Sequence, residues 1–200
     1  EAQTLGLRAV ALTDRDGVPG IVRAWAKARA LGVKLLTGSE VTLHDGTTLT
    51  LLAMNRAGYA SLCRLVTAGR LRSPKGQCRV GWGEVAAHAD GLLALWGGRK
   101  ALLTAEEGPE AALAGTLKEA FGDRLYALMA RHSTAAETVH EARLVERAGR
   151  LGLPLVAGVE VLYHTPTRRP LQDVLTCIRE GVTLRTAGSK TRPNHLHALP

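Results

Sequence analysis

The chain of 200 residues is long enough to bury the core of one domain, and a hydrophobic share of 46% is ordinary for a folded globular protein. It contains no run of about 18 apolar residues and does not open with the basic and apolar regions of a secretory signal, which argues against a transmembrane helix and against export. The net charge of +8 favours an anionic partner such as nucleic acid.

Helices and short apolar strands alternate along the chain. A helix ending in Leu, then a Gly, then an apolar strand is predicted at 5–11, 31–37 and 151–157, because Gly readily adopts the positive φ that often follows a helix. Further strands are predicted at 48–54, 91–95 and 124–129. Further helices are predicted at 21–31, 59–66, 83–89, 110–121, 144–151 and 170–180. The chain opens as if inside a helix, which suggests a fragment, and it looks irregular after Gly181.

This alternation predicts an α/β fold built on a parallel sheet or barrel. In such barrels functional side chains lie where strands run out into the following loops. Acids occupy three of these places: Asp14 with Asp16, Glu40 after a strand expected to end at Gly38, and Glu160. Converging carboxylates are suited to bind metal ions. The alternative, that Asp14 and Asp16 cap the next helix, stays open.

Histidine and cysteine add little to a metal site. The seven histidines form no H-x-H pair next to a strand, apart from His195 and His197 in the irregular tail, and His88 and His140 look structural. The cysteines are odd in number and far apart, so they are interpreted as reduced, buried or half-buried thiols; they are Cys63, Cys78 and Cys177.

Basic residues gather where acids are missing. No acid lies between Asp45 and Glu84, and a basic loop is predicted over 70–79. Candidate contacts with a DNA backbone are Arg64, Arg70, Arg72, Lys75 and Arg79. Aromatic residues, at 4%, are too scarce for a base-stacking platform. A solvated basic face without any partner remains the alternative.

Three stretches resemble one family. Residues 9–17, A-V-A-L-T-D-R-D-G, with T-G-S-E at 37–40, resemble the second and third motifs of PHP (polymerase and histidinol phosphatase) domains. Residues 51–65 resemble the version found in bacterial C-family DNA polymerases, and residues 164–181 resemble the junction that leaves this domain in their error-prone branch. The resemblance implies a PHP-type distorted (β/α)7 barrel, missing its first strand, over residues 1–165. It implies a junction helix and linker toward an absent polymerase (palm) domain over residues 166–200.

Active PHP domains bind metal ions with clustered His, Asp, Glu and Cys residues. The resemblance places that cluster, here degenerate, at Asp14, Arg15, Glu40, Thr48, Gly98, Glu160 and Leu162. The residual metal-binding candidates are Asp14, Glu40 and Glu160. Arg15 stands where a ligand belongs and cannot be one, because its guanidinium stays protonated. We expect Arg15 to pair with Asp14, Glu40 or Glu160 and to supply the positive charge in place of a metal.

The resemblance implies a cytoplasmic, error-prone DNA-directed DNA polymerase that acts in translesion synthesis and damage-induced mutagenesis. This segment is expected to be a scaffold without catalytic residues or a cofactor of its own, because two-metal phosphoryl transfer needs the aspartates and Mg²⁺ of the palm domain. Expected partners are primer–template DNA, dNTPs and other repair or replication proteins. Two alternatives stay open: a free-standing PHP-type metal-dependent phosphoesterase, and a non-catalytic basic module that binds nucleic acid or protein.

Overall fold

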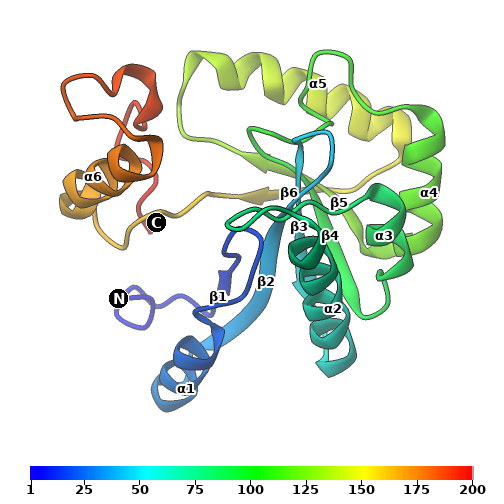
Figure 1. The fold of residues 1–200 in the computed structure, drawn as a ribbon, viewed down its shortest axis with the longest axis horizontal. Helices are drawn as coiled ribbons and strands as arrows, with labels where there is room; N and C mark the ends of the chain where they lie inside the picture. Colours follow the sequence, from blue (N-terminus) through cyan, green and yellow to red (C-terminus); the bar gives the residue numbers. More distant parts are fainter. Residues whose placement is uncertain (200) are drawn as a thin grey trace.

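The computed structural model describes residues 1–199, apart from the side chains of residues 135 and 136; Pro200, the last residue of the expected linker, lies outside the described residues. Six strands form one curled sheet in sequential order (Figure 1). They are β1 (Ala9–Leu12), β2 (Lys34–Thr42), β3 (Thr48–Ala53), β4 (Leu92–Gly97), β5 (Leu125–Ala130) and β6 (Leu155–Gly158). The α/β class and the incomplete barrel expected from the sequence are confirmed.

The sheet is mixed rather than wholly parallel. Strand β3 runs antiparallel to both of its neighbours, whereas the pairs β1–β2, β4–β5 and β5–β6 are parallel. The expectation of a parallel sheet was wrong at β3, because the connection from β2 is a tight turn and a parallel pair needs a much longer crossover. Asp45 closes that turn by accepting hydrogen bonds from the main-chain N–H and the hydroxyl of Thr47, at 2.8 and 2.6 Å.

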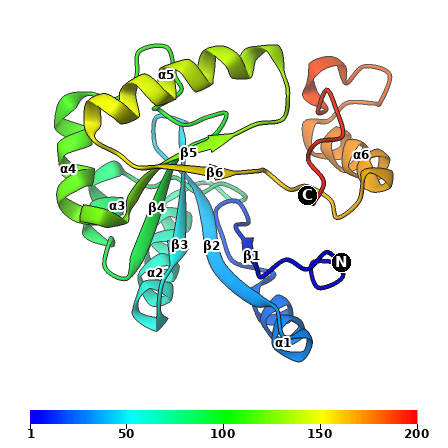
Figure 2. The ribbon, with the colours of Figure 1, turned by 180° about the vertical axis from the view of Figure 1, so that it is seen from behind.

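Six helices accompany the strands. They are α1 (Ile21–Leu31), α2 (Arg56–Arg72), α3 (Trp82–Ala87), α4 (Ala111–Phe121), α5 (Ala135–Leu151) and α6 (Arg169–Glu180). Short 3-10 turns lie at Gly122–Arg124, Pro166–Arg168 and Gly188–Lys190. Helices α1, α2, α4 and α5 pack against the sheet and α3 packs against α4, while α6 stands apart beside the open side of the sheet (Figures 1 and 2). None of the helices in residues 1–199 has the length and apolar character needed to cross a bilayer.

The recurring Leu-Gly pattern ends helices as predicted. Gly32, Gly152 and Gly181 each have a left-handed φ, and the next residue donates its N–H back into the last helical turn. Residues 1–6 close in the same way, with Gly6 at φ 68° and the Leu7 N–H bonded to the Ala2 carbonyl, but they form a single turn rather than a helix.

The core lies between the sheet and helices α2 to α5. Leu51, Trp96 and Phe121 are completely buried there. The start of α2 is held tightly against the start of β4, since a Cβ atom added at Gly58 would lie 1.9 Å from the Gly91 carbonyl oxygen. By contrast, β1 and β6 each pair on one side only and form the two edges of the sheet.

Candidate functional site

The sequence-predicted site positions meet at one edge of the sheet. Strands β1, β2, β4, β5 and β6 run in one direction, so their carboxyl ends lie together, and antiparallel β3 brings its amino end to the same edge. We call this the carboxyl edge. The positions that lie along it are Asp14, Arg15, Glu40, Thr48, Gly98, Glu160 and Leu162.

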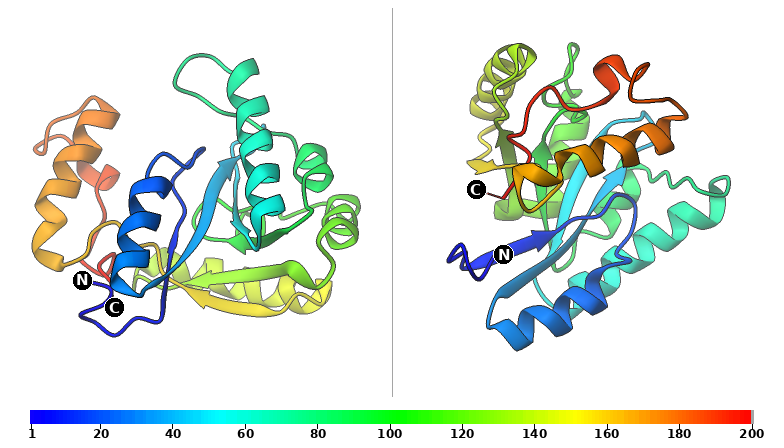
Figure 3. Two further views of the ribbon diagram at one scale, coloured as in Figure 1. Left: turned by 90° about the horizontal axis from the view of Figure 1, so that it is seen from below. Right: turned by 90° about the vertical axis from the view of Figure 1, so that its left-hand side faces the viewer.

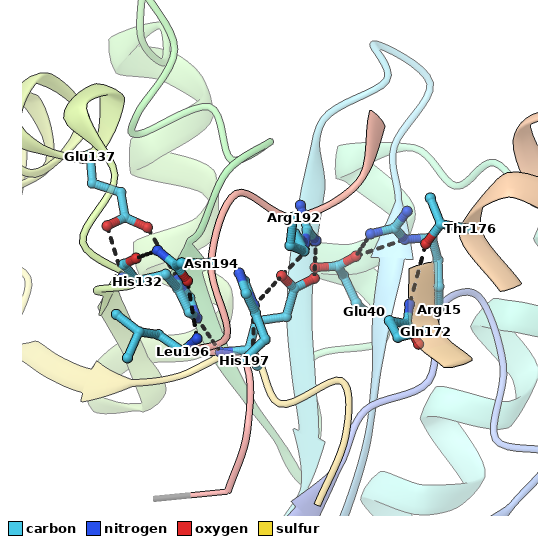
Figure 4. Close-up of polar contacts among 11 residues, drawn as sticks. Arg15, Glu40, His132, Glu137, Gln172, Thr176, Arg192, Asn194, Leu196 and His197 are labelled. Atoms are coloured by element: carbon cyan, nitrogen blue, oxygen red, sulfur yellow. Dashed lines mark hydrogen bonds and ion pairs between the residues drawn. The ribbon is translucent and has the colours of Figure 1, made fainter. Parts of the chain in front are cut away.

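Glu40 lies inside β2 rather than in the loop after it. The strand was expected to end at Gly38, but pairing with β3 carries it on to Thr42. The Arg15 guanidinium donates to Glu40 Oε1 from Nε at 2.8 Å and from Nη2 at 2.5 Å (Figure 4). The expected pairing of Arg15 with a neighbouring acid is therefore present. Because the Arg15 side chain is 48% exposed, solvent screens this ion pair.

Asp14 and Asp16, in the loop between β1 and α1, contact β2 in different ways. The Asp16 carboxylate accepts hydrogen bonds from Thr42, at 2.7 Å from the main-chain N–H and 2.8 Å from the hydroxyl, and thereby ties the loop to β2. Asp14 joins the same strand through its main-chain carbonyl, which accepts from the Ser39 hydroxyl at 2.9 Å. Neither caps the next helix, because the N-cap of α1 is Gly20 and no side chain caps this helix; the capping alternative was wrong.

Glu160 is held by the carboxyl-terminal tail. After α6, residues 190–199 return to the carboxyl edge, and we call them the tail. Nη2 of Arg192 donates to both Glu160 oxygens, at 2.7 and 2.6 Å, and His197 Nδ1 lies 3.3 Å from Oε2. Burial alone raises the pKa of Glu160, but the hydrogen bond from His197 and the charge of Arg192 outweigh it and lower the pKa from 4.5 to about 2.

His132, two residues after the end of β5, also lies on this edge and was not predicted from the sequence. The Glu160 N–H lies 3.1 Å from His132 Nε2 and can only donate, so Nε2 accepts and the ring proton sits on Nδ1. That proton is donated to Glu137 at 3.1 Å (Figure 4). Its place at the end of the predicted strand 124–129 was the available signal. Both ring nitrogens are thus engaged, and neither has a lone pair free for a metal.

Glu137 anchors the loop that carries His132. Its carboxylate accepts from the main-chain N–H groups of His132 and Thr134, at 2.8 and 3.0 Å. Burial raises the pKa of Glu137, but these N–H donors more than compensate and the pKa falls below its usual range.

The remaining predicted positions offer little to a cation. Gly98 and Leu162 have no ligand atom in their side chains, and the Leu162 N–H donates to the His197 carbonyl at 2.8 Å, beneath the tail. Thr48 is buried, and its N–H bonds to the Lys100 carbonyl at 3.0 Å. Within residues 1–199 no three His, Cys, Asp or Glu side chains are grouped as a metal site would require. Of the acids along the carboxyl edge, Glu40 and Glu160 are each engaged by a guanidinium.

Three of the five residues expected to contact DNA are tied into the fold. Helix α2 extends through Arg70 and Arg72, so the expected loop over 70–79 was wrong at its start. Arg70 donates to the Asp16 carbonyl at 2.9 and 2.7 Å, and Arg79 donates to the Leu43 carbonyl at 3.2 Å. Arg72 donates to both oxygens of Glu84, at 2.6 and 2.7 Å.

The other two expected contacts lie at the surface. Arg64 donates to the Ser61 hydroxyl at 3.2 Å and is exposed. Lys75 is exposed in the loop between α2 and α3. The three cysteines are free thiols, with Cys78 and Cys177 buried and Cys63 half-buried.

Comparison with known proteins agrees with this geometry. The PHP domain model matches residues 1–142. The error-prone DNA polymerase of Pseudomonas paraeruginosa is 41% identical over 201 residues, which cover 99% of this chain and 19% of that protein. The error-prone DNA polymerase of Caulobacter vibrioides is 35% identical over 194 residues, or 96% of this chain and 18% of that protein. The chain thus spans about a fifth of the length of these curated relatives.

A solved structure from Bifidobacterium adolescentis, described as a metal-dependent phosphoesterase, shares the fold. The two structures superpose with a TM-score of 0.53 at 17% sequence identity, over 78% of each chain. At this identity the likeness concerns the fold alone.

Proposed function

This chain belongs to the PHP domain family, and we propose that it is the PHP segment of an error-prone DNA polymerase and serves there as a scaffold. In this proposal residues 1–165 form the PHP domain, and residues 166–200 form the junction toward a palm domain. The polymerase reaction, with its Mg²⁺, its dNTPs and its primer–template DNA, belongs to the rest of that protein, a cytoplasmic enzyme of translesion synthesis and damage-induced mutagenesis.

One observation carries the scaffold role. Two of the three acids expected as residual metal ligands, Glu40 and Glu160, are each paired with a guanidinium, from Arg15 and Arg192. A fixed positive charge beside each carboxylate does the electrostatic work of a bound cation without offering a coordination site. The edge is then a structural joint between the barrel and the tail.

Metal analysis of the purified chain tests this role. The protein is equilibrated with excess Zn²⁺ or Mn²⁺, passed through a desalting column and measured by mass spectrometry. We expect metal well below one equivalent. Stoichiometric retention of either ion would overturn the replacement of the metal by ion pairs.

The assignment to an error-prone polymerase rests on the similarity to the curated relatives and is tested through the gene. The reading frame around this segment is expected to continue into a polymerase several times longer, because the relatives are about five times its length. A frame that closes around this segment alone would overturn that assignment. Hydrolysis of a phosphodiester by the chain with Mn²⁺ would instead favour a phosphoesterase.

A further inference from the structure

Helix α1 carries exposed basic residues with no acid near them in the sequence. From Gly17 to Ser39 the chain contains no acid, yet Arg23, Lys27 and Arg29 lie within this stretch, and all three are exposed. Val22 and Trp25 are also exposed, with relative accessible surfaces of 75% and 54%.

These residues spread over an arc of about 200° around the helix. At about 100° per residue, the order around the exposed arc is Trp25, Arg29, Val22, Ala26, Ala30, Arg23 and Lys27. The indole therefore stands on one side of a flat floor of small residues, and two cations stand on the other. A shallow groove of about 630 Å³ runs along the side of this arc that carries Arg23 and Lys27, lined by Arg23, Ala24, Ala26, Lys27 and Ala30. We call Val22, Arg23, Trp25, Ala26, Lys27 and Arg29 the α1 surface.

The three cations of the α1 surface differ in their contacts within the described residues. In residues 1–199 no hydrogen bond or ion pair engages the side chains of Arg23 or Lys27, and Arg29 lies 5.4 Å from the centre of the Trp25 ring. This is the reverse of α2, where Arg70 and Arg72 are held by Asp16 and Glu84. Figure 3 shows α1 on the outside of the molecule with no other helix lying over it.

We propose that the α1 surface binds single-stranded DNA, an inference that rests on the proposed function for its choice of DNA over RNA. Arg23 and Lys27 face the same side one helical turn apart, which suits successive phosphates of one strand. Trp25 offers a flat face on which one base stacks, next to the Arg29 guanidinium. A single indole makes this a local clamp rather than a base-stacking platform.

Charge and shape together favour DNA over the other anionic partners. An acidic peptide would use the three cations without an aromatic face, whereas an anionic lipid surface would also take up the indole, so binding to vesicles is measured beside binding to DNA. The indole therefore separates DNA from an acidic peptide experimentally: base stacking depends on the ring, whereas charge attraction does not.

Binding of a fluorescein-labelled oligothymidylate to the whole chain, followed by anisotropy across a salt series, tests the proposal. The Arg23→Gln/Lys27→Gln variant is expected to reduce the slope of log K against log salt by about 1.4, at about 0.7 per lost phosphate contact. The matched control is Arg99→Gln/Lys100→Gln, which removes the same charge from two exposed residues elsewhere. An equal loss in this control would overturn a specific α1 surface.

Substitutions of Trp25 provide the second test. Trp25→Ala is expected to weaken binding at least about fivefold without changing the salt slope, and Trp25→Phe to retain most of the affinity. Circular dichroism and melting curves establish that each variant is folded. An unchanged affinity for Trp25→Ala, or equally tight binding of polyglutamate or of phosphatidylserine vesicles, would overturn DNA as the partner. Absence of DNA binding would refute this inference alone, because the metal analysis and the reading frame test the proposed function separately.

Discussion

The rings of His132 and His197 stack face to face, with centroids 3.9 Å apart and planes within 7°. One residue follows β5 and the other comes from the tail, and both are almost fully buried. The Asn194 side chain also donates to the His132 carbonyl (Figure 4). The tail is therefore packed against the carboxyl edge, and its side chains complete the electrostatics of that edge.

The tail should contribute measurably to stability through Arg192. Arg192→Gln leaves Glu160 without its guanidinium partner in a half-buried place. We expect the free energy of unfolding to fall by about 1–3 kcal/mol, measured by urea denaturation. Arg185→Gln, a change at an exposed residue between α6 and the tail, should stay within about 0.5 kcal/mol of the wild type. Equal losses of stability in the two variants would contradict a stabilising role of the Arg192–Glu160 ion pair.

Glu160 should contribute to the change of the unfolding free energy with pH. Its pKa is lowered from 4.5 to about 2, so the folded state holds this proton less tightly than the unfolded state does. The resulting stabilisation is present above pH 4.5 and is lost as the pH falls toward 2. Because the side chain is 36% exposed, we expect only about 1–2 kcal/mol.

Comparison with Glu160→Gln isolates this contribution. The lowered pKa values of Glu84 and Glu137 act in the same direction in both proteins, so they cancel in the difference. Urea denaturation at several pH values should therefore show a shallower acid limb for Glu160→Gln. If the unfolding free energies of the two proteins changed with pH in parallel, the contacts of Glu160 with Arg192 and His197 would not lower its pKa.

Placing an imidazole at position 15 should not create a metal site. Arg15→His supplies an imidazole, but Glu160 remains paired with Arg192 and the His132 Nε2 lone pair remains occupied. We expect the variant to retain as little Zn²⁺ as the wild type, measured by mass spectrometry after desalting. One bound equivalent would show that Arg15 alone blocks the site.

The close approach of α2 to β4 predicts a strong effect of one methyl group. Gly58→Ala places a Cβ 1.9 Å from the Gly91 carbonyl oxygen, so backbone must move, and we expect a loss of at least about 2 kcal/mol. Gly115→Ala, within α4 with nothing inside 4 Å of its added Cβ, should gain about 0.5–1 kcal/mol. Thermal melts of the two variants should therefore shift in opposite directions.

Local patterns were sufficient for much of this molecule. The helix ends at Gly32, Gly152 and Gly181 follow from nearby residues, because a left-handed φ after a helix favours Gly. The convergence of Asp14, Glu40 and Glu160 on one edge follows from strand direction, which alternation with helices predicts. The reversed direction of β3 does not follow from the alternation of strands and helices. It follows from the connection between β2 and β3, which is too short for a parallel crossover.

Contacts between segments far apart in the chain were beyond such patterns. Nothing near Arg192 or His197 indicates that they meet Glu160, and Arg70 looks as available to DNA as Arg23 until Asp16 is brought beside it. Composition and periodicity report what a residue is and which face it occupies. Which charges become paired depends on how the tail and the loops pack, since an ion pair forms only where the folded chain places two groups within a few ångströms of each other.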